Sequence, residues 1–147
     1  IEGACKERIY PIGRLDRMTT GLLLFTNDGE MATRLTQSKK GVQAIFHIEL
    51  SQKMKGEHLD SLRDGVKLEE GYFKPDEINL VQGDPYQIGL KMQSSKTNSI
   101  RKAFESFGYK LKKLDRVMFA GLTKKDLPRG RYRHLSPQEV NFLKMIR

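Results

Sequence analysis

The stretch from residue 66 to residue 92 alternates short runs of β-type residues with turn signals. The turn signals are Glu70-Gly71, Pro75-Asp76 and Gly83-Asp84-Pro85. Short runs bounded by Gly, Pro and Asp are typical of antiparallel strands joined by hairpin turns. This part of the chain is therefore predicted to be a strand meander.

The remaining pattern adds further strands and a few helices. Strands are predicted over 21–26, a continuous apolar run, over 42–50 and over 110–119. Residues 10–13 are expected to be a loop or an edge strand, and helices are predicted over 30–36, 56–63 and 98–107, with residues 1–8 as the end of another. Ser136 and Glu139 form a capping box with Pro137 at the first helical position, which predicts a closing helix over 137–146. Together these elements predict an α+β fold, with a mostly antiparallel mixed sheet and flanking helices.

The positive charge is concentrated in the last third of the chain. The 147 residues carry 27 Lys and Arg against 18 Asp and Glu, a formal net charge of +9. Residues 91–133 hold thirteen basic and three acidic side chains, a net of +10, so the rest of the chain sums to −1. A regional excess of this kind favours a phosphate-binding surface, with a generally solvated basic surface as the alternative.

Several classes of protein are excluded by what the sequence lacks. Its apolar runs fall far below the roughly 20 residues that a membrane helix needs. Cys5 is the only cysteine, so no internal disulfide forms, and the three histidines are too far apart in the sequence to match metal-ligand spacing. We expect a cytoplasmic protein with no metal.

One carboxylate has an unusual setting. Asp16 lies in a polar stretch between Arg14 and Arg17, directly ahead of the apolar run, with Gly13 and Gly21 allowing close backbone approach. Neighbouring cations favour the ionised form of such a group. The residues alone leave two interpretations open: a structural Asp that caps a turn or pairs with an Arg, and a functional anion.

The whole run from Gly13 to Gly29, GRLDRMTTGLLLFTNDG, resembles the signature of the RNA pseudouridine synthases of the RsuA/RluB/RluE/RluF group, which modify ribosomal RNA. The stretches 64–71, 114–122 and 126–135 are similar to further segments of the same group. The resemblance covers practically the whole chain. It implies the pseudouridine synthase catalytic fold over residues 1–147, without the small N-terminal RNA-binding module and the leading strand that the group normally has.

The resemblance also implies a reaction and its residues. A uridine is extruded from the RNA, its glycosidic bond is broken, and the uracil is rejoined through C5, with no cofactor. Asp16 is implied to be catalytic, either as a nucleophile or as a base on the ribose. Arg101 falls on the Arg of a later motif and is implied to pair with Asp16; the alternative is a solvated Arg on an amphipathic helix.

Phe46 stands where the group usually has a Tyr that stacks on the target base. It keeps the ring for stacking and lacks the hydroxyl, and the alternative is an ordinary core aromatic. Ala44, Ser95 and Thr97 also depart from the group's motifs. The residues expected to contact RNA phosphates are Arg14, Arg17, Lys96, Lys102, Arg116, Arg129 and Arg131.

The implied partner is ribosomal RNA, with the large subunit favoured, bound by a monomer. Two alternatives stay open. One is a non-catalytic RNA-binding or ribosome-assembly protein on the same fold, and the other is the same chemistry on transfer RNA.

Overall fold

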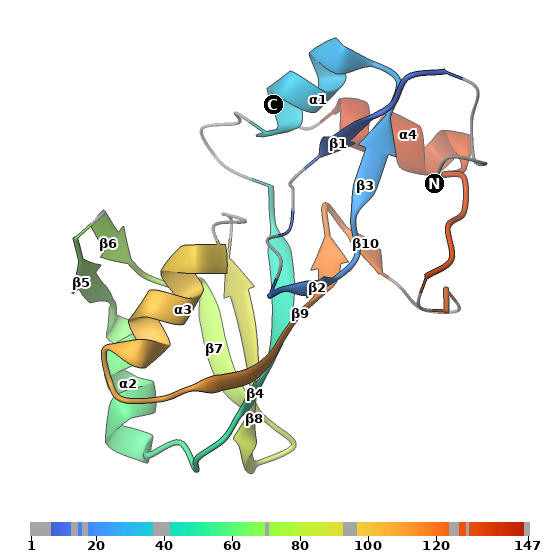
Figure 1. Cartoon of the computed structure of the whole chain (residues 1–147). Coiled ribbons are helices and arrows are strands. Elements are labelled where there is room, and N and C mark those ends of the chain that lie inside the picture. Colours follow the sequence, from blue (N-terminus) through green and yellow to red (C-terminus); the bar gives the residue numbers. More distant parts are fainter. Residues whose placement is uncertain are drawn as a thin grey trace.

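A computed structural model of the chain describes residues 7–12, 15, 18–36, 42–69, 71–92, 97–123, 127–128 and 130–145 (Figure 1). Its strands are β1 (Tyr10–Ile12), β2 (Thr20–Gly21), β3 (Leu24–Thr26), β4 (Ala44–Leu50), β5 (Val66–Leu68), β6 (Gly71–Phe73), β7 (Glu77–Val81), β8 (Asp84–Met92), β9 (Leu111–Phe119) and β10 (Leu122–Thr123). The helices are α1 (Gly29–Thr36), α2 (Gly56–Asp64), α3 (Thr97–Glu105) and α4 (Pro137–Lys144). The predicted α+β class is confirmed.

The main sheet is mixed and mostly antiparallel. Within the described residues it has the order β10-β9-β4-β8-β7, and β2 pairs with β9 in parallel beside β10. Two small sheets, β1-β3 and β5-β6, stand apart from it. Figure 1 shows α2 and α3 near β5, β6 and β7 at one end, and α1 and α4 with β1 and β3 at the other. The strand β9 runs between the two ends.

One face of the main sheet builds the core. Along β4, residues 44, 46, 48 and 50 are buried and alternate with half-buried ones, the period-two pattern of a strand with one inward face. Phe46 lies opposite Leu90 of β8, so both side chains point to the same face. Ile100 and Phe104 of α3 are also fully buried and join this core.

Two of the hairpins use tight turns with positive φ at both central residues. Gln82 and Gly83 join β7 to β8, and Ala120 and Gly121 join β9 to β10. Two-residue turns of this kind match the twist of antiparallel strands. The first turn begins one residue before the turn signal Gly83-Asp84-Pro85 and shares Gly83 with it.

The predicted continuous strand over 21–26 is wrong, because the run divides between two partners. Thr20 and Gly21 pair with β9, whereas Leu24–Thr26 pairs with β1 in a separate sheet. Leu22 still bonds to β9, its N–H donating to the Arg116 carbonyl at 2.9 Å. The chain then leaves that strand and changes sheet, which apolar composition alone does not reveal.

The helix predictions hold, apart from the N-terminal one. The helices α1, α2 and α3 begin within one residue of the predicted starts. The helix α3 ends at Glu105, and a turn follows it to Gly108, whose φ is +85. The helix predicted over residues 1–8 lies largely outside the described residues, and the described Glu7 and Arg8 are not helical.

The helix α4 begins with the predicted capping box. Ser136 Oγ accepts from Glu139 N–H at 3.2 Å, and Glu139 accepts from Ser136 N–H at 2.8 Å. Glu139 also binds both terminal nitrogens of Arg133, at 2.8 and 2.7 Å. The hydrogen bonds from Arg133, followed by that from the Ser136 backbone, lower the pKa of Glu139 from 4.5 to about 2.

The start of α4 is therefore expected to loosen only in strong acid. The pKa of Glu139 is lower in the folded chain than in the unfolded one, so the ionised carboxylate stabilises the fold above pH 4.5, and this contribution is lost as the pH falls towards 2. An NMR titration of the Glu139 carboxyl checks this. Arg133→Gln should raise the midpoint, and a midpoint near 4.5 in the unchanged chain would contradict the prediction.

No helix among the described residues is long and apolar enough to span a membrane.

Candidate active site

The segment of residues 18–22, which follows Asp16, is fastened to helix α3. Arg101 of α3 is half-buried, and its guanidinium donates a hydrogen bond to Thr19 Oγ1 at 3.0 Å. Thr19 is 7% exposed. Asp16 lies outside the described residues, but three residues of chain span at most about 11 Å. Arg101 is thus held in the neighbourhood where the sequence predicts its carboxylate partner.

The same segment is fastened to strand β9. Thr20 Oγ1 donates to Asp115 Oδ1 at 2.9 Å, and Asp115 is only 4% exposed. In the parallel pairing of β2 with β9, Thr20 is opposite Asp115 and Gly21 is opposite Arg116. A Cβ on Gly21 would lie 2.3 Å from the Arg116 carbonyl oxygen, so the two backbones approach as closely as only glycine permits.

Arg116 completes this attachment, and its buried position differs from the exposed phosphate contact that the sequence predicts. Its side chain is fully buried, and Nε and one terminal nitrogen donate to the Leu22 carbonyl at 2.9 and 2.8 Å. The guanidinium also lies over the Phe119 ring, 4.0 Å from the centroid. Burial lowers the pKa of Arg116 to about 10, so it remains a cation at neutral pH.

Phe46 lies beside this attachment, opposite Arg116 across β4 and β9. Its ring is 0% exposed and belongs to the core. This placement matches the alternative of an ordinary core aromatic. A base can stack on the ring only where the groups that cover it move aside, so stacking on Phe46 stays a prediction.

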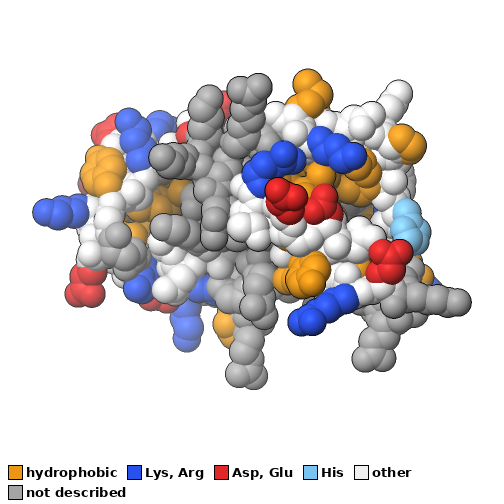
Figure 2. Space-filling model, turned by 90° about the horizontal axis from the view of Figure 1, so that it is seen from above, with side chains coloured by type: hydrophobic (Ala, Val, Ile, Leu, Met, Phe, Trp, Pro, Cys, Tyr) orange, Lys and Arg blue, Asp and Glu red, His pale blue; other side chains and the backbone are white. Residues whose placement is uncertain are grey.

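The other predicted RNA contacts divide into two groups. Lys102 lies on the exposed side of α3, and Arg131 is exposed ahead of α4. The rest fall outside the described residues: Arg14, Arg17, Lys96 and Arg129. In the view of Figure 2, the described Lys and Arg side chains are spread out, and several have acidic ones beside them.

Three polar residues of the site were missed by the sequence reading: Thr19, Thr20 and Asp115. They carry no charge pattern of their own, but Asp115 is the one acidic residue in the basic stretch 110–119. An acid in the interior of a strand that is otherwise Lys-rich and apolar is a signal for a buried polar contact. That signal could have directed attention to the β2–β9 pairing.

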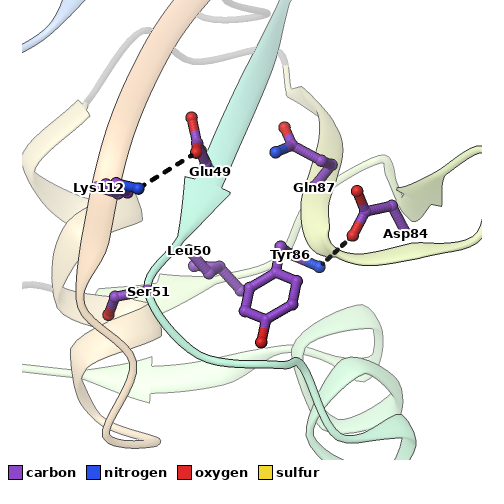
Figure 3. A pocket seen from close by; sticks show the side chains of 7 residues that line it. All are labelled: Glu49, Leu50, Ser51, Asp84, Tyr86, Gln87 and Lys112. Carbon is purple, nitrogen blue, oxygen red and sulfur yellow. Dashed lines mark hydrogen bonds and ion pairs between the residues drawn. The ribbon is translucent and has the colours of Figure 1, made fainter.

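A hollow of about 380 Å³ lies at the far ends of β4, β8 and β9 (Figure 3). Glu49, Asp84, Tyr86 and Lys112 are among its lining residues, and Glu49 forms an ion pair with Lys112 at 3.8 Å. None of the predicted site residues lines it. The part of the chain that the structure describes also holds no group of three or more His, Cys, Asp or Glu side chains able to bind a metal.

The contacts around Thr19 are suited to fixing the position of one chain segment, residues 19–22. The helix α3 and the strand β9 bind residues 19–22 through side chains that are mostly buried. Anchors of this kind fix residues 19–22 relative to a rigid sheet.

Comparison with known proteins identifies a family and several relatives. The sequence profile of the RNA pseudouridylate synthase family matches residues 2–106. Ribosomal large subunit pseudouridine synthase B of Bacillus subtilis (strain 168) is 36% identical over 144 residues, which cover 95% of this chain and 59% of the relative. The protein of the same description from Haemophilus influenzae is 31% identical, with 95% and 40% covered. The chain thus spans about half the length of these curated relatives.

Solved structures share the fold. A crystal structure of a pseudouridylate synthase superposes with a TM-score of 0.83 at 26% identity, covering 92% of this chain and 59% of that one. A protein in an H/ACA RNP bound to a substrate RNA containing 2′-deoxyuridine superposes with a TM-score of 0.52 at 13% identity, a likeness of fold alone. Since the family profile matches well over half of its residues, the chain belongs to the RNA pseudouridylate synthase family.

Proposed function

We propose that this chain is the catalytic domain of an enzyme that converts a specific uridine of ribosomal RNA, with the large subunit favoured, to pseudouridine. The observation that carries the proposal is the hydrogen bond from Arg101 to Thr19, because Thr19 is only three residues after Asp16 in the sequence. Family membership and the relatives' descriptions support the substrate class. A cytoplasmic monomer stays the prediction for its state in the cell.

The reaction is an isomerisation, so its atoms balance without a further reactant. The bond between N1 and C1′ breaks and a bond between C5 and C1′ forms, while a proton leaves C5 and N1 takes one up. No electron is gained or lost overall. The proposal therefore needs no redox partner and no group donor, and a cofactor is not part of it.

Asp16 is proposed to drive the step at the ribose, as a nucleophile at C1′ or as a base. Both roles need an anion, and Arg101 is proposed as the cation that holds and stabilises it. Extrusion of the uridine must precede either role, because a stacked base does not expose the reacting atoms. Lys102 and Arg131, both exposed, are proposed to contact phosphates.

A second candidate function is a non-catalytic RNA-binding or ribosome-assembly protein. The observation that favours it is the buried ring of Phe46, which lacks the hydroxyl of the usual Tyr and is closed to a base as it lies here. General acid–base help, typically worth about 10²- to 10⁴-fold, cannot come from a phenyl ring. Such a protein would bind RNA in a salt-sensitive way and leave no product.

Pseudouridine maps of ribosomal RNA separate the two functions. We expect a strain without the gene to lose the modification at one uridine relative to its parent. A plasmid copy of the gene serves as the control and should restore it. Identical maps in the two strains would contradict the proposed activity on ribosomal RNA.

A further inference from the structure

A short segment ahead of α4 exposes aromatic and basic side chains together. It comprises residues 130–135 and is called the basic–aromatic segment below. Arg131, Tyr132 and His134 are all exposed, Tyr132 with 55% of its surface. The segment has neither helix nor strand structure. The stretch from Leu127 to Gln138 contains no acidic residue, so nothing next to these side chains in the sequence repels an anion.

The basic–aromatic segment is nevertheless held by hydrogen bonds near both ends. Arg133 makes the two-pronged ion pair with Glu139 in the first turn of α4, and Glu139 in turn closes the capping box with Ser136. At the other end, the Arg131 N–H donates to the Pro128 carbonyl at 3.1 Å, which closes a turn. Arg133 is occupied by Glu139, which leaves Arg131 as the outward cation. A segment already fixed loses little freedom when it binds.

The two rings do not stack face to face on each other. Tyr132 and His134 meet edge to face, with centroids 6.1 Å apart and planes at 85°. In this arrangement a ring keeps a face on which a planar group can lie. Exposed aromatic faces beside an arginine are the combination that proteins use for unpaired nucleotides, since every base has a π-face and every linkage a phosphate.

We propose that the basic–aromatic segment binds a single-stranded stretch of the substrate RNA, with a base stacked on Tyr132 and a phosphate on Arg131. The proposal rests on the proposed function, because it assigns a second contact to the same RNA. Double-stranded RNA does not fit, because its bases are stacked on one another and offer no free face. His134 supports Tyr132 from its edge.

The test measures affinity for a probe, a labelled short single-stranded oligouridylate, by fluorescence anisotropy. Tyr132→Leu is expected to weaken binding about 5- to 150-fold, the equivalent of one lost base stack. Tyr132→Phe should bind as the unchanged chain does. Arg131→Gln should reduce the slope of log K against log salt by about 1.

Tyr86→Leu is the matched control. Tyr86 is 39% exposed and lies in the hollow with Glu49 and Asp84, whose carboxylates repel phosphates (Figure 3). Tyr86→Leu should leave the affinity for the probe within twofold of that of the unchanged chain. The proposal is overturned when Tyr132→Leu binds as well as the unchanged chain, or when the unchanged chain does not bind the probe.

This outcome is separable from the proposed function. A chain that binds through Tyr132 but forms no pseudouridine would refute the enzyme and keep the interface. A chain that forms pseudouridine, but whose affinity for the probe does not change in Tyr132→Leu, would keep the enzyme and refute the interface. Thermal unfolding of Tyr132→Leu should match that of the unchanged chain, because the side chain is largely exposed.

Discussion

Asp16→Asn is expected to abolish pseudouridine formation and to leave RNA affinity nearly unchanged. The amide has the size of the carboxylate but is neutral, so it can serve neither as a nucleophile nor as a base. Loss of a general base alone costs about 10²- to 10⁴-fold in rate. Single-turnover formation of pseudouridine at saturating RNA measures the loss, and anisotropy on the same RNA measures the affinity.

Asp84→Asn is the control for the change of charge. Asp84 is an exposed carboxylate in the hollow lined by Tyr86 and Lys112, where no predicted site residue lies. Its replacement should leave the rate within twofold. Wild-type turnover in the Asp16→Asn variant would end the assignment of Asp16 as the catalytic group.

Gly21→Ala is expected to destabilise the fold by about 2–5 kcal/mol. The added Cβ would lie 2.3 Å from a backbone oxygen of β9, and φ at Gly21 is +123, so close approach and backbone strain add together. Relief of the clash must move β2 away from β9, which disturbs the hydrogen bond from Thr20 to Asp115. Urea unfolding measures the stability, and the rate of pseudouridine formation should fall with it.

Gly108→Ala is the control that separates backbone strain from the close approach of two backbones. Gly108 also has a positive φ, +85, but among the described residues no atom beyond its chain neighbours lies within 4 Å of the position of its Cβ. Strain without a clash costs about 1–2 kcal/mol. A loss at Gly21 no greater than that at Gly108 would show that the close approach to Arg116 contributes nothing.

The sequence predicted the elements whose signals are local. The capping box predicted the start of α4, and the β-type residues of 42–50 predicted the strand that contains β4. Such patterns depend on neighbouring residues along the chain, so they can be recognised without knowledge of the tertiary contacts. The motif likewise directed attention to Asp16 and Arg101.

Two differences from the sequence predictions involve pairings between distant residues. The run over 21–26 is apolar throughout, and nothing in it tells that Gly21 pairs with β9 and Leu24 with β1. Arg116 was taken for a phosphate contact because a basic residue in a basic region is usually exposed. Only the sheet register reveals that it faces the core opposite Phe46 and binds the Leu22 carbonyl.

The attachment of residues 19–22 to β9 sets an order for the assembly of this domain. Thr20 and Asp115 are 95 residues apart, and Asp115 lies beyond residue 106, where the match to the family profile ends. Contacts so distant in sequence form only after the chain between them has been made and closed into a loop. During synthesis, residues 19–22 therefore leave the ribosome long before β9 does. An unfinished chain that already contains Asp16 and Arg101 still lacks the strand to which residues 20–22 are attached.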